Sequence, residues 1–256
     1  MKQKICIVGV ALFSVLLLVS GIMLCRQYFD EKKSDESFTE LAQLVKEELQ
    51  VNPDAESEEE KTPEETAFDK YVDIYALNND LIGWISTPGT NINYPVMQTK
   101  DNPNYYLKHN FEKQYSDYGV PYVAENCDID ISDNTVIYGH HMKNGTMFSD
   151  LVSYASQSFY EEHKIIRFDT LGGFGVYEII AVFKTPVYTE SGFRYYQFTN
   201  AAAQEEFEAY VDQCMALSLY DTGVTAEYGD KLITLSTCEY SQQNGRLVVV
   251  AKKISE

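Results

Sequence analysis

The chain has 256 residues, enough for one well-buried domain with accessory segments. Its net charge of −19 argues against a nucleic-acid-binding protein, which would carry a basic surface. The aromatic content of 13%, with 20 Tyr and 13 Phe, favours a β-rich core over a disordered chain.

The first predicted element is an apolar helix over residues 5–25, a run of 21 residues without a charge. That length spans a bilayer. Lys2 and Lys4 precede the run and an acidic sequence follows Arg26, so the positive-inside rule places residues 1–4 in the cytoplasm. A cleaved signal peptide is the alternative, although its apolar core is usually shorter and no A-x-A-like site follows. We expect a single-pass membrane protein that contacts lipid through residues 5–25, with residues 26–256 outside the cell.

Residues 26–66 form an acidic juncture with 14 acidic and 5 basic residues. Apolar residues from Phe38 to Leu49 recur at helical spacing, which predicts a short amphipathic helix. The following stretch, Asn52 to Glu65, has no apolar period and predicts a solvated, extended linker.

Residues 67–256 have the pattern of a β-rich domain. A helix is expected over Phe68–Asn78, and two further helical stretches over Thr146–His163 and Asn200–Leu217. Short apolar runs separated by turn residues predict eight strands, and their number and spacing favour a closed barrel or a sandwich. The runs cover residues 81–86, 91–98, 119–124, 134–139, 165–169, 175–185, 231–237 and 246–253.

Five cysteines are present, two of them in the apolar run. The other three are an odd number, so at least one thiol stays free unless chains pair. A bridge between Cys127 and Cys214 is possible but not expected. No CxxC or clustered His/Cys spacing indicates a structural metal, and we expect no cofactor.

The last two predicted strands form a hairpin with chemistry at its mouth, KLITLSTCEYSQQNGRLVVVAKK. Asn244 and Gly245 supply turn residues that tolerate positive φ. If the strands pair antiparallel, Cys238 and Arg246 lie together at one rim of the sheet. A cation there favours a thiolate and can stabilise a developing oxyanion. The alternative is a half-buried cysteine beside a surface arginine.

A second candidate lies in NTVIYGHHMKNGTMF, where a predicted strand ends at Tyr138 and Gly139 releases the chain. A histidine at the strand tip, His140, could serve as general acid and base for a thiol nucleophile. His141 competes for this role, and adjacent histidines are often only part of a polar loop.

The combination of YGHH, TLSTC and an arginine eight residues later, ahead of a Val-rich strand, resembles the sortases. The resemblance covers about Ala67 to Ser255. The stretches INYPVMQ and YGHHMKNGTMF and the helical insertion at Asn200–Leu217 resemble class B more than the smaller class A.

This resemblance implies an eight-stranded barrel and a cysteine transpeptidase that works without a metal. Such enzymes cleave a secreted protein after the threonine of a C-terminal sorting signal, of NPxTx or xPxTG type. The acyl-enzyme is then resolved by an amine, commonly from a peptidoglycan precursor. A pilus-polymerising sortase is the alternative within the family.

The same resemblance implies roles for individual residues. Cys238 is the nucleophile, His140 the general acid and base, and Arg246 the group that stabilises the oxyanion. Some class B relatives carry an acid two positions after the cysteine; here that residue is Tyr240, and the acid is Glu239, which is implied to offer its backbone N–H. Residues implied to line the peptide groove are Asn93, Met97, Tyr138, Ser236 and Thr237.

Rival classes fit less well. Papain-like proteases place Cys before His, caspase-like enzymes need a QACxG-type motif, and L,D-transpeptidases carry a different His-Gly-Cys-type motif. A membrane-tethered barrel that only binds a ligand would leave the Cys–Arg hairpin and the strand-tip histidine as coincidences.

Overall fold

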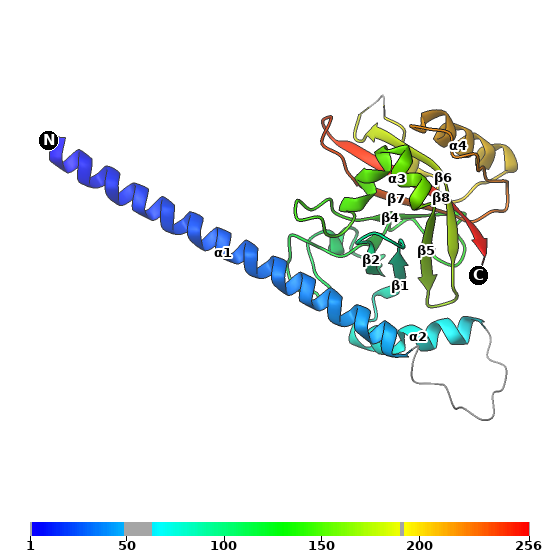
Figure 1. Cartoon of the computed structure of the whole chain (residues 1–256), viewed down its shortest axis with the longest axis horizontal. Helices are drawn as coiled ribbons and strands as arrows, with labels where there is room; N and C mark the ends of the chain where they lie inside the picture. Colours follow the sequence, from blue (N-terminus) through cyan, green and yellow to red (C-terminus); the bar gives the residue numbers. More distant parts are fainter. Residues whose placement is uncertain (1, 49–62, 190–191, 256) are drawn as a thin grey trace. The chain divides into compact units, whose positions relative to one another are not determined.

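The structure is a computed structural model that describes residues 2–48, 63–189 and 192–255. The chain forms two compact units, Met1–Glu40 and Leu41–Glu256. All strands belong to the second unit (Figure 1).

The N-terminal element is one continuous helix, α1 (Lys2–Glu48), where the sequence predicted an apolar helix and a separate amphipathic one. No Gly or Pro lies between Arg26 and Glu48 to break the helix. An 18-residue window within it has a mean hydropathy of 1.7, and apolar side chains such as Leu12, Phe13 and Leu16 are exposed. By length and composition this helix fits a membrane anchor.

The second helix, α2 (Pro63–Leu77), begins earlier than predicted. Most of the predicted extended linker lies outside the described residues, but its last three residues, Pro63 to Glu65, form the first turn of α2. Proline suits a first helical position because no N–H is needed there.

Eight strands close into a barrel in the order β1-β2-β3-β4-β7-β8-β6-β5, which confirms the predicted fold class. Each predicted run overlaps one strand, and β5, β6, β7 and β8 extend past the predicted bounds. The pairs β2–β3 and β4–β7 are parallel and the others antiparallel. The strands are β1 (Leu81–Ser86), β2 (Asn93–Met97), β3 (Tyr122–Val123), β4 (Asn134–Tyr138), β5 (Ile165–Thr170), β6 (Val176–Pro186), β7 (Leu232–Cys238) and β8 (Gly245–Ser255).

Alternate side chains of these strands point into the barrel and form its core. Ile85, Ile166, Phe168, Leu235 and Val249 are almost completely buried. The side chains that alternate with them, such as Ser236 and Cys238 on β7, lie on the outer face.

Short helices cover parts of the outer face. The stretch predicted as helical after β4 forms the 3-10 helix η2 (Ser149–Ala155) and α3 (Gln157–Glu162), separated by Ser156 in an extended conformation. The second predicted stretch forms α4 (Gln204–Leu217), which buries Phe207, Tyr210, Val211 and Cys214 beside β6 (Figure 1). Two further 3-10 helices are η1 (Tyr105–Leu107) and η3 (Tyr195–Gln197).

Candidate active site

The ends of β4 and β7 lie side by side at one rim of the barrel. Tyr138 pairs with Ser236, and the Gly139 N–H donates to the Ser236 carbonyl at 3.2 Å. The Thr237 hydroxyl in turn donates to the Gly139 carbonyl at 2.8 Å. His140 follows Gly139 after the end of β4, and Cys238 is the last residue of β7. Because the two strands pair in parallel, both residues lie at the same rim of the barrel.

The β7–β8 hairpin adds the arginine. Cys238 and Arg246 are directly opposite each other in the antiparallel register, as the sequence predicted. Asn244 adopts a φ of 56°, which confirms the expected turn chemistry. One guanidinium nitrogen, Nη1, donates to the Gly245 carbonyl at 2.9 Å, which ties the side chain to its own hairpin.

His140 is held by a backbone carbonyl rather than by a carboxylate. Its Nε2–H donates to the Leu107 carbonyl at 2.7 Å. Because a carbonyl only accepts, this bond places the proton of the neutral ring on Nε2 and leaves Nδ1 to exchange protons. Burial lowers the pKa of His140, and the hydrogen bond to Leu107 and the charge of Asp117 only partly offset this.

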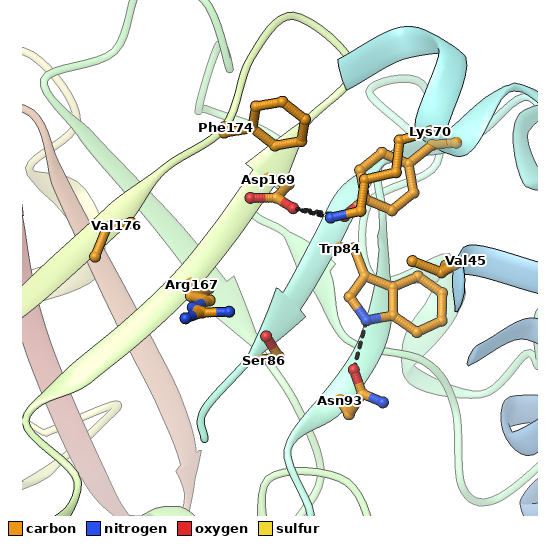
Figure 2. Close-up of a pocket in the computed structure, with 10 residues that line it drawn as sticks. Val45, Lys70, Trp84, Ser86, Asn93, Arg167, Asp169, Phe174 and Val176 are labelled. Atoms are coloured by element: carbon orange, nitrogen blue, oxygen red, sulfur yellow. Dashed lines mark hydrogen bonds and ion pairs between the residues drawn. The ribbon is translucent and has the colours of Figure 1, made fainter. Parts of the chain in front are cut away.

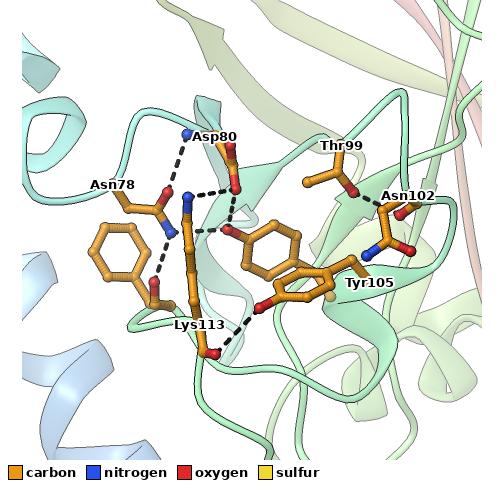
Figure 3. Close-up of polar contacts among 8 residues, drawn as sticks. Asn78, Asp80, Thr99, Asn102, Tyr105 and Lys113 are labelled. Atoms are coloured by element: carbon orange, nitrogen blue, oxygen red, sulfur yellow. Dashed lines mark hydrogen bonds and ion pairs between the residues drawn. The ribbon is translucent and has the colours of Figure 1, made fainter.

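A polar network holds η1, the segment that carries the Leu107 carbonyl, in place (Figure 3). The buried Asn78 amide donates to the Tyr106 hydroxyl at 2.8 Å and to the Phe111 carbonyl at 2.6 Å. Tyr106 donates onward to Asp80 at 2.8 Å, and Lys113 pairs with Asp80 at 2.9 Å. Burial raises the pKa of Tyr106, so it stays protonated and keeps donating.

A glycine permits this segment to approach the rest of the loop closely. Gly119 has a φ of +61°, and a Cβ built on it would lie 2.4 Å from the Tyr106 carbonyl oxygen and 3.0 Å from that of Leu107. A larger residue at this position would therefore push on the carbonyl that holds His140.

The two adjacent histidines have different partners. His141 donates from Nδ1 to the Cys238 carbonyl at 3.1 Å, and its ring lies 5.2 Å from that of Tyr240. His141 is thus bonded to the backbone of Cys238 and His140 to the backbone of η1, and each ring has a second nitrogen outside this bond. His140 directly follows Gly139 at the end of β4, and its role as the acid–base group stays a prediction.

Both the carboxylate and the backbone N–H of Glu239 already have hydrogen-bond partners. One carboxylate oxygen accepts from Lys184 at 3.1 Å, and the other accepts from the Ser241 hydroxyl at 2.6 Å. Burial alone would raise the pKa of Glu239, but these donors outweigh it and lower the pKa. The backbone N–H donates to the Gly245 carbonyl at 3.0 Å. It is therefore already bonded, contrary to the expectation that it would be offered to an oxyanion.

Two of the residues expected to line the groove share the face and rim of Cys238. Ser236 lies two residues before it on β7, but its side chain is buried and its hydroxyl lies 2.6 Å from that of Tyr195. Tyr138 is half-buried and neighbours Tyr122, with ring centroids 5.5 Å apart. Burial raises the pKa of Tyr195 to about 12. Tyr195 therefore keeps a neutral hydroxyl, which is hydrogen-bonded to Ser236.

Three other expected groove residues have different positions. Thr237 points to the opposite face of β7 from Cys238 and is buried, because side chains alternate along a strand. Met97 pairs with Tyr122 but is 0% exposed, so it supports the sheet rather than a ligand. Asn93 is exposed at the other end of β2, where its Oδ1 accepts from the Trp84 indole at 2.7 Å.

Sequence reasoning missed Leu107, Tyr122 and Tyr195. Tyr122 lies within a predicted strand next to Pro121, but nothing in the sequence indicated which strand would pair with β4. Leu107 contributes only a backbone oxygen, which leaves no trace in side-chain patterns.

The remaining cysteines of the barrel unit, Cys127 and Cys214, are buried free thiols. Burial raises the pKa of Cys127 to about 11 and that of Cys214 to about 12. Cys238 is partly exposed, and it is the cysteine that the barrel presents at a rim beside a histidine and an arginine.

Comparisons with known proteins agree with this geometry. The Sortase domain model matches residues 85–254. Sortase B of Staphylococcus aureus is 32% identical over 262 aligned positions, covering 99% of this chain and 98% of the relative. Sortase B of Listeria monocytogenes is 35% identical over 192 positions, covering 73% and 75% of the two chains.

Solved structures show the same fold. The S. aureus sortase B–substrate complex has a TM-score of 0.76 and 29% identity, covering 89% of this chain and 99% of that one. A sortase B complexed with triglycine has a TM-score of 0.76 and 30% identity, covering 88% and 99%. The chain therefore belongs to the sortase family of cysteine transpeptidases. Within that family, both curated relatives and the aligned structures are of class B, and this chain is a class B sortase.

Proposed function

We propose that this sortase cleaves a C-terminal sorting signal of NPxTx or xPxTG type after its threonine and transfers the acyl group to a cell-wall amine. The observation that carries the proposal is the meeting of Cys238, Arg246 and His140 at one barrel rim. Relatives solved with a substrate and with triglycine support it, because a glycine peptide carries the kind of α-amine that could resolve an acyl-enzyme.

In the first half-reaction the Cys238 thiolate attacks the threonine carbonyl carbon and a C–S bond forms. The carbonyl oxygen becomes an oxyanion, which the Arg246 guanidinium stabilises. The C–N bond then breaks as His140, protonated at Nδ1, gives that proton to the leaving amine. A thioester on Cys238 and a neutral His140 remain.

The second half-reaction reverses these roles. The incoming amine attacks the thioester carbonyl while His140 accepts its proton at Nδ1. The C–S bond breaks and the electron pair returns to Cys238 as a thiolate. An amide is made for each amide broken, so the reaction needs no external energy source and no cofactor.

The partners that follow are secreted proteins with a C-terminal sorting signal and a peptidoglycan precursor or cross-bridge amine. We further propose that α1 anchors the chain with residues 1–4 in the cytoplasm and the barrel outside, because Lys2 and Lys4 precede the apolar run. Protease added to intact, wall-stripped cells should then digest the barrel; full protection would contradict this orientation.

The test of the activity uses quenched-fluorophore peptides that carry each signal type, together with a panel of amines. Mass spectrometry of the products should show cleavage after threonine and, with the right amine, a new amide. Absence of cleavage of every peptide by a folded chain would contradict the proposal.

A further inference from the structure

A polar hollow, separate from the catalytic rim, lies on the outer face of the barrel between α2 and strands β1 and β5 (Figure 2). Its volume is about 380 Å³, within the usual range for small-molecule sites. In the closed strand order, β1 is opposite β7, which carries Cys238. The hollow shares no residue with the catalytic rim.

One wall of the hollow is a row of three hydrogen-bond donors on adjacent strands. The register pairs Ser86 of β1 with Arg167 of β5 on one side and with Asn93 of β2 on the other. Cross-strand partners point to the same face of a sheet, so the guanidinium, hydroxyl and carboxamide are neighbours.

These donors are available to a ligand. Within the described part of the chain, neither the Arg167 guanidinium nor the Ser86 hydroxyl has a hydrogen-bond partner, and Arg167 is exposed. Asn93 uses its Oδ1 to accept from the Trp84 indole at 2.7 Å, which leaves its NH₂ group to donate. Figure 2 shows this bond as a dashed line between Trp84 and Asn93.

The other charges of the hollow cancel. Lys70 of α2 pairs with Asp169 at 2.7 Å, and the Tyr71 hydroxyl donates to the same carboxylate at 2.6 Å. Both side chains of the ion pair are largely covered. Arg167 is left as the one uncompensated charge among the lining residues, so the hollow is matched to a ligand with a single negative charge.

The remaining walls are apolar or aromatic. Trp84 stacks on Tyr71 at a centroid distance of 6.4 Å, and Phe174 and Val176 form the far side. A ligand with an oxyanion at one end could therefore place a short carbon segment against these side chains.

We propose that Arg167, Ser86 and Asn93 bind a singly charged oxyanion, a carboxylate or a phosphodiester, carried by a molecule that fits the hollow beside Trp84. A guanidinium matches both groups because its planar fork donates two parallel hydrogen bonds. The sources differ: a carboxylate comes from a small metabolite or peptide end, and a phosphodiester from a phospholipid headgroup.

The test exploits the fact that Trp84 is the sole tryptophan of the chain. The full chain in an uncharged detergent is titrated with N-acetylglycine, with glycerophosphoglycerol and with the neutral N-acetylglycinamide, and tryptophan fluorescence is recorded. We expect a saturable change with at least one anion and none with the neutral amide. Saturation by N-acetylglycine alone indicates the carboxylate source, and saturation by glycerophosphoglycerol alone indicates the headgroup.

Variants test the donor row. Arg167→Gln should weaken binding of the anion by roughly tenfold to a hundredfold, since it removes a charge-assisted hydrogen bond. Ser86→Ala should weaken it less. Lys164→Gln removes a positive charge three positions before Arg167 in the chain but outside the hollow, and this variant should bind the anion as the wild type does. The proposal is overturned if neither anion saturates the signal, or if Arg167→Gln and Lys164→Gln bind equally well.

Discussion

The Nε2–H of His140 donates to the Leu107 carbonyl at 2.7 Å, a main-chain acceptor 33 residues earlier in the chain. In a Ser-His-Asp triad a carboxylate fixes the tautomer and the direction of the imidazole. Here the η1 segment performs the same task with a neutral dipole. No carboxylate among the described residues bonds to His140. The acid that directly follows Cys238, Glu239, is bonded to Lys184 and Ser241 instead.

The first prediction tests this carbonyl through Gly119. Gly119→Ala should lower kcat by about tenfold to a hundredfold, because displacing a catalytic group by about 1 Å can cost that much. Its new Cβ would lie 2.4 Å from the Tyr106 oxygen and 3.0 Å from that of Leu107. Peptide cleavage measures the rate, and a thermal melt checks the fold.

Gly223→Ala is the matched control. Gly223 also has positive φ, at +71°, but a Cβ there meets nothing within 4 Å. Backbone strain alone should affect both variants equally. If Gly223→Ala loses as much kcat as Gly119→Ala, the Leu107 carbonyl does not orient the histidine.

The second prediction concerns the thiols of the barrel. Cys238→Ala should abolish both cleavage and transfer, whereas Cys127→Ala and Cys214→Ala should retain them. Burial raises the pKa of the latter two to about 11 and about 12, so at neutral pH they hold almost no thiolate. An alkylating probe followed by peptide mapping should label Cys238 first. Normal turnover by Cys238→Ala would end the cysteine-transpeptidase hypothesis.

The third prediction separates the two histidines. His140→Ala should lose nearly all activity, since it removes the proton carrier. His141→Ala should keep most of its activity, because it removes a hydrogen bond to the Cys238 carbonyl but not the proton carrier. Single-turnover cleavage of a fluorogenic peptide measures both. A dead His141→Ala beside an active His140→Ala would reverse the assignment.

The strands and the pairing of Cys238 with Arg246 follow from the sequence because they rest on local rules, whereas the closed barrel and the role of His140 came from the resemblance to the sortases. Period-two apolar runs define the strands, Asn244-Gly245 defines the hairpin, and the hairpin sets Cys238 opposite Arg246. The groove residues depend instead on which strands meet and which face each side chain takes. Thr237 directly precedes Cys238 in the chain, yet Thr237, Ser236 and Met97 are all buried in the structure.

The Leu107 carbonyl could not be predicted for a different reason. Its placement depends on a loop fixed by Asn78, Tyr106 and Asp80, which come from separate segments and are joined only in the folded chain. Likewise, one helix replaces two at the N-terminus because the charged stretch after Arg26 lacks any helix-breaking residue.

The fourth prediction concerns the charges around His140. Burial lowers its pKa most; the Lys108 charge lowers it further and the Asp117 charge raises it. Lys108 and Asp117 pair at 2.8 Å and act on His140 with opposite signs, so removing either charge removes its own effect on the ring. Asp117→Asn should therefore lower the pKa of His140, and Lys108→Gln should raise it.

NMR titration of the His140 ring protons would show both shifts. Because neutral His140 must accept a proton in the second half-reaction, the acidic limb of transfer should move to lower pH in Asp117→Asn and to higher pH in Lys108→Gln. Shifts of the same sign in both variants would contradict this account of the field at the ring.

The last prediction assigns Arg246. Its Nη1 is tied to the Gly245 carbonyl at 2.9 Å, which orients the planar fork while other N–H groups remain for the oxyanion. A lysine keeps the charge but not the fork. Losing one oxyanion donor typically costs a factor of roughly 100–1,000 in turnover. We therefore expect Arg246→Lys to fall by about that factor in kcat while it melts near the wild-type temperature. A quenched-fluorophore peptide measures turnover, and near-normal turnover by Arg246→Lys would show that charge alone suffices and that the fork has no role at this rim.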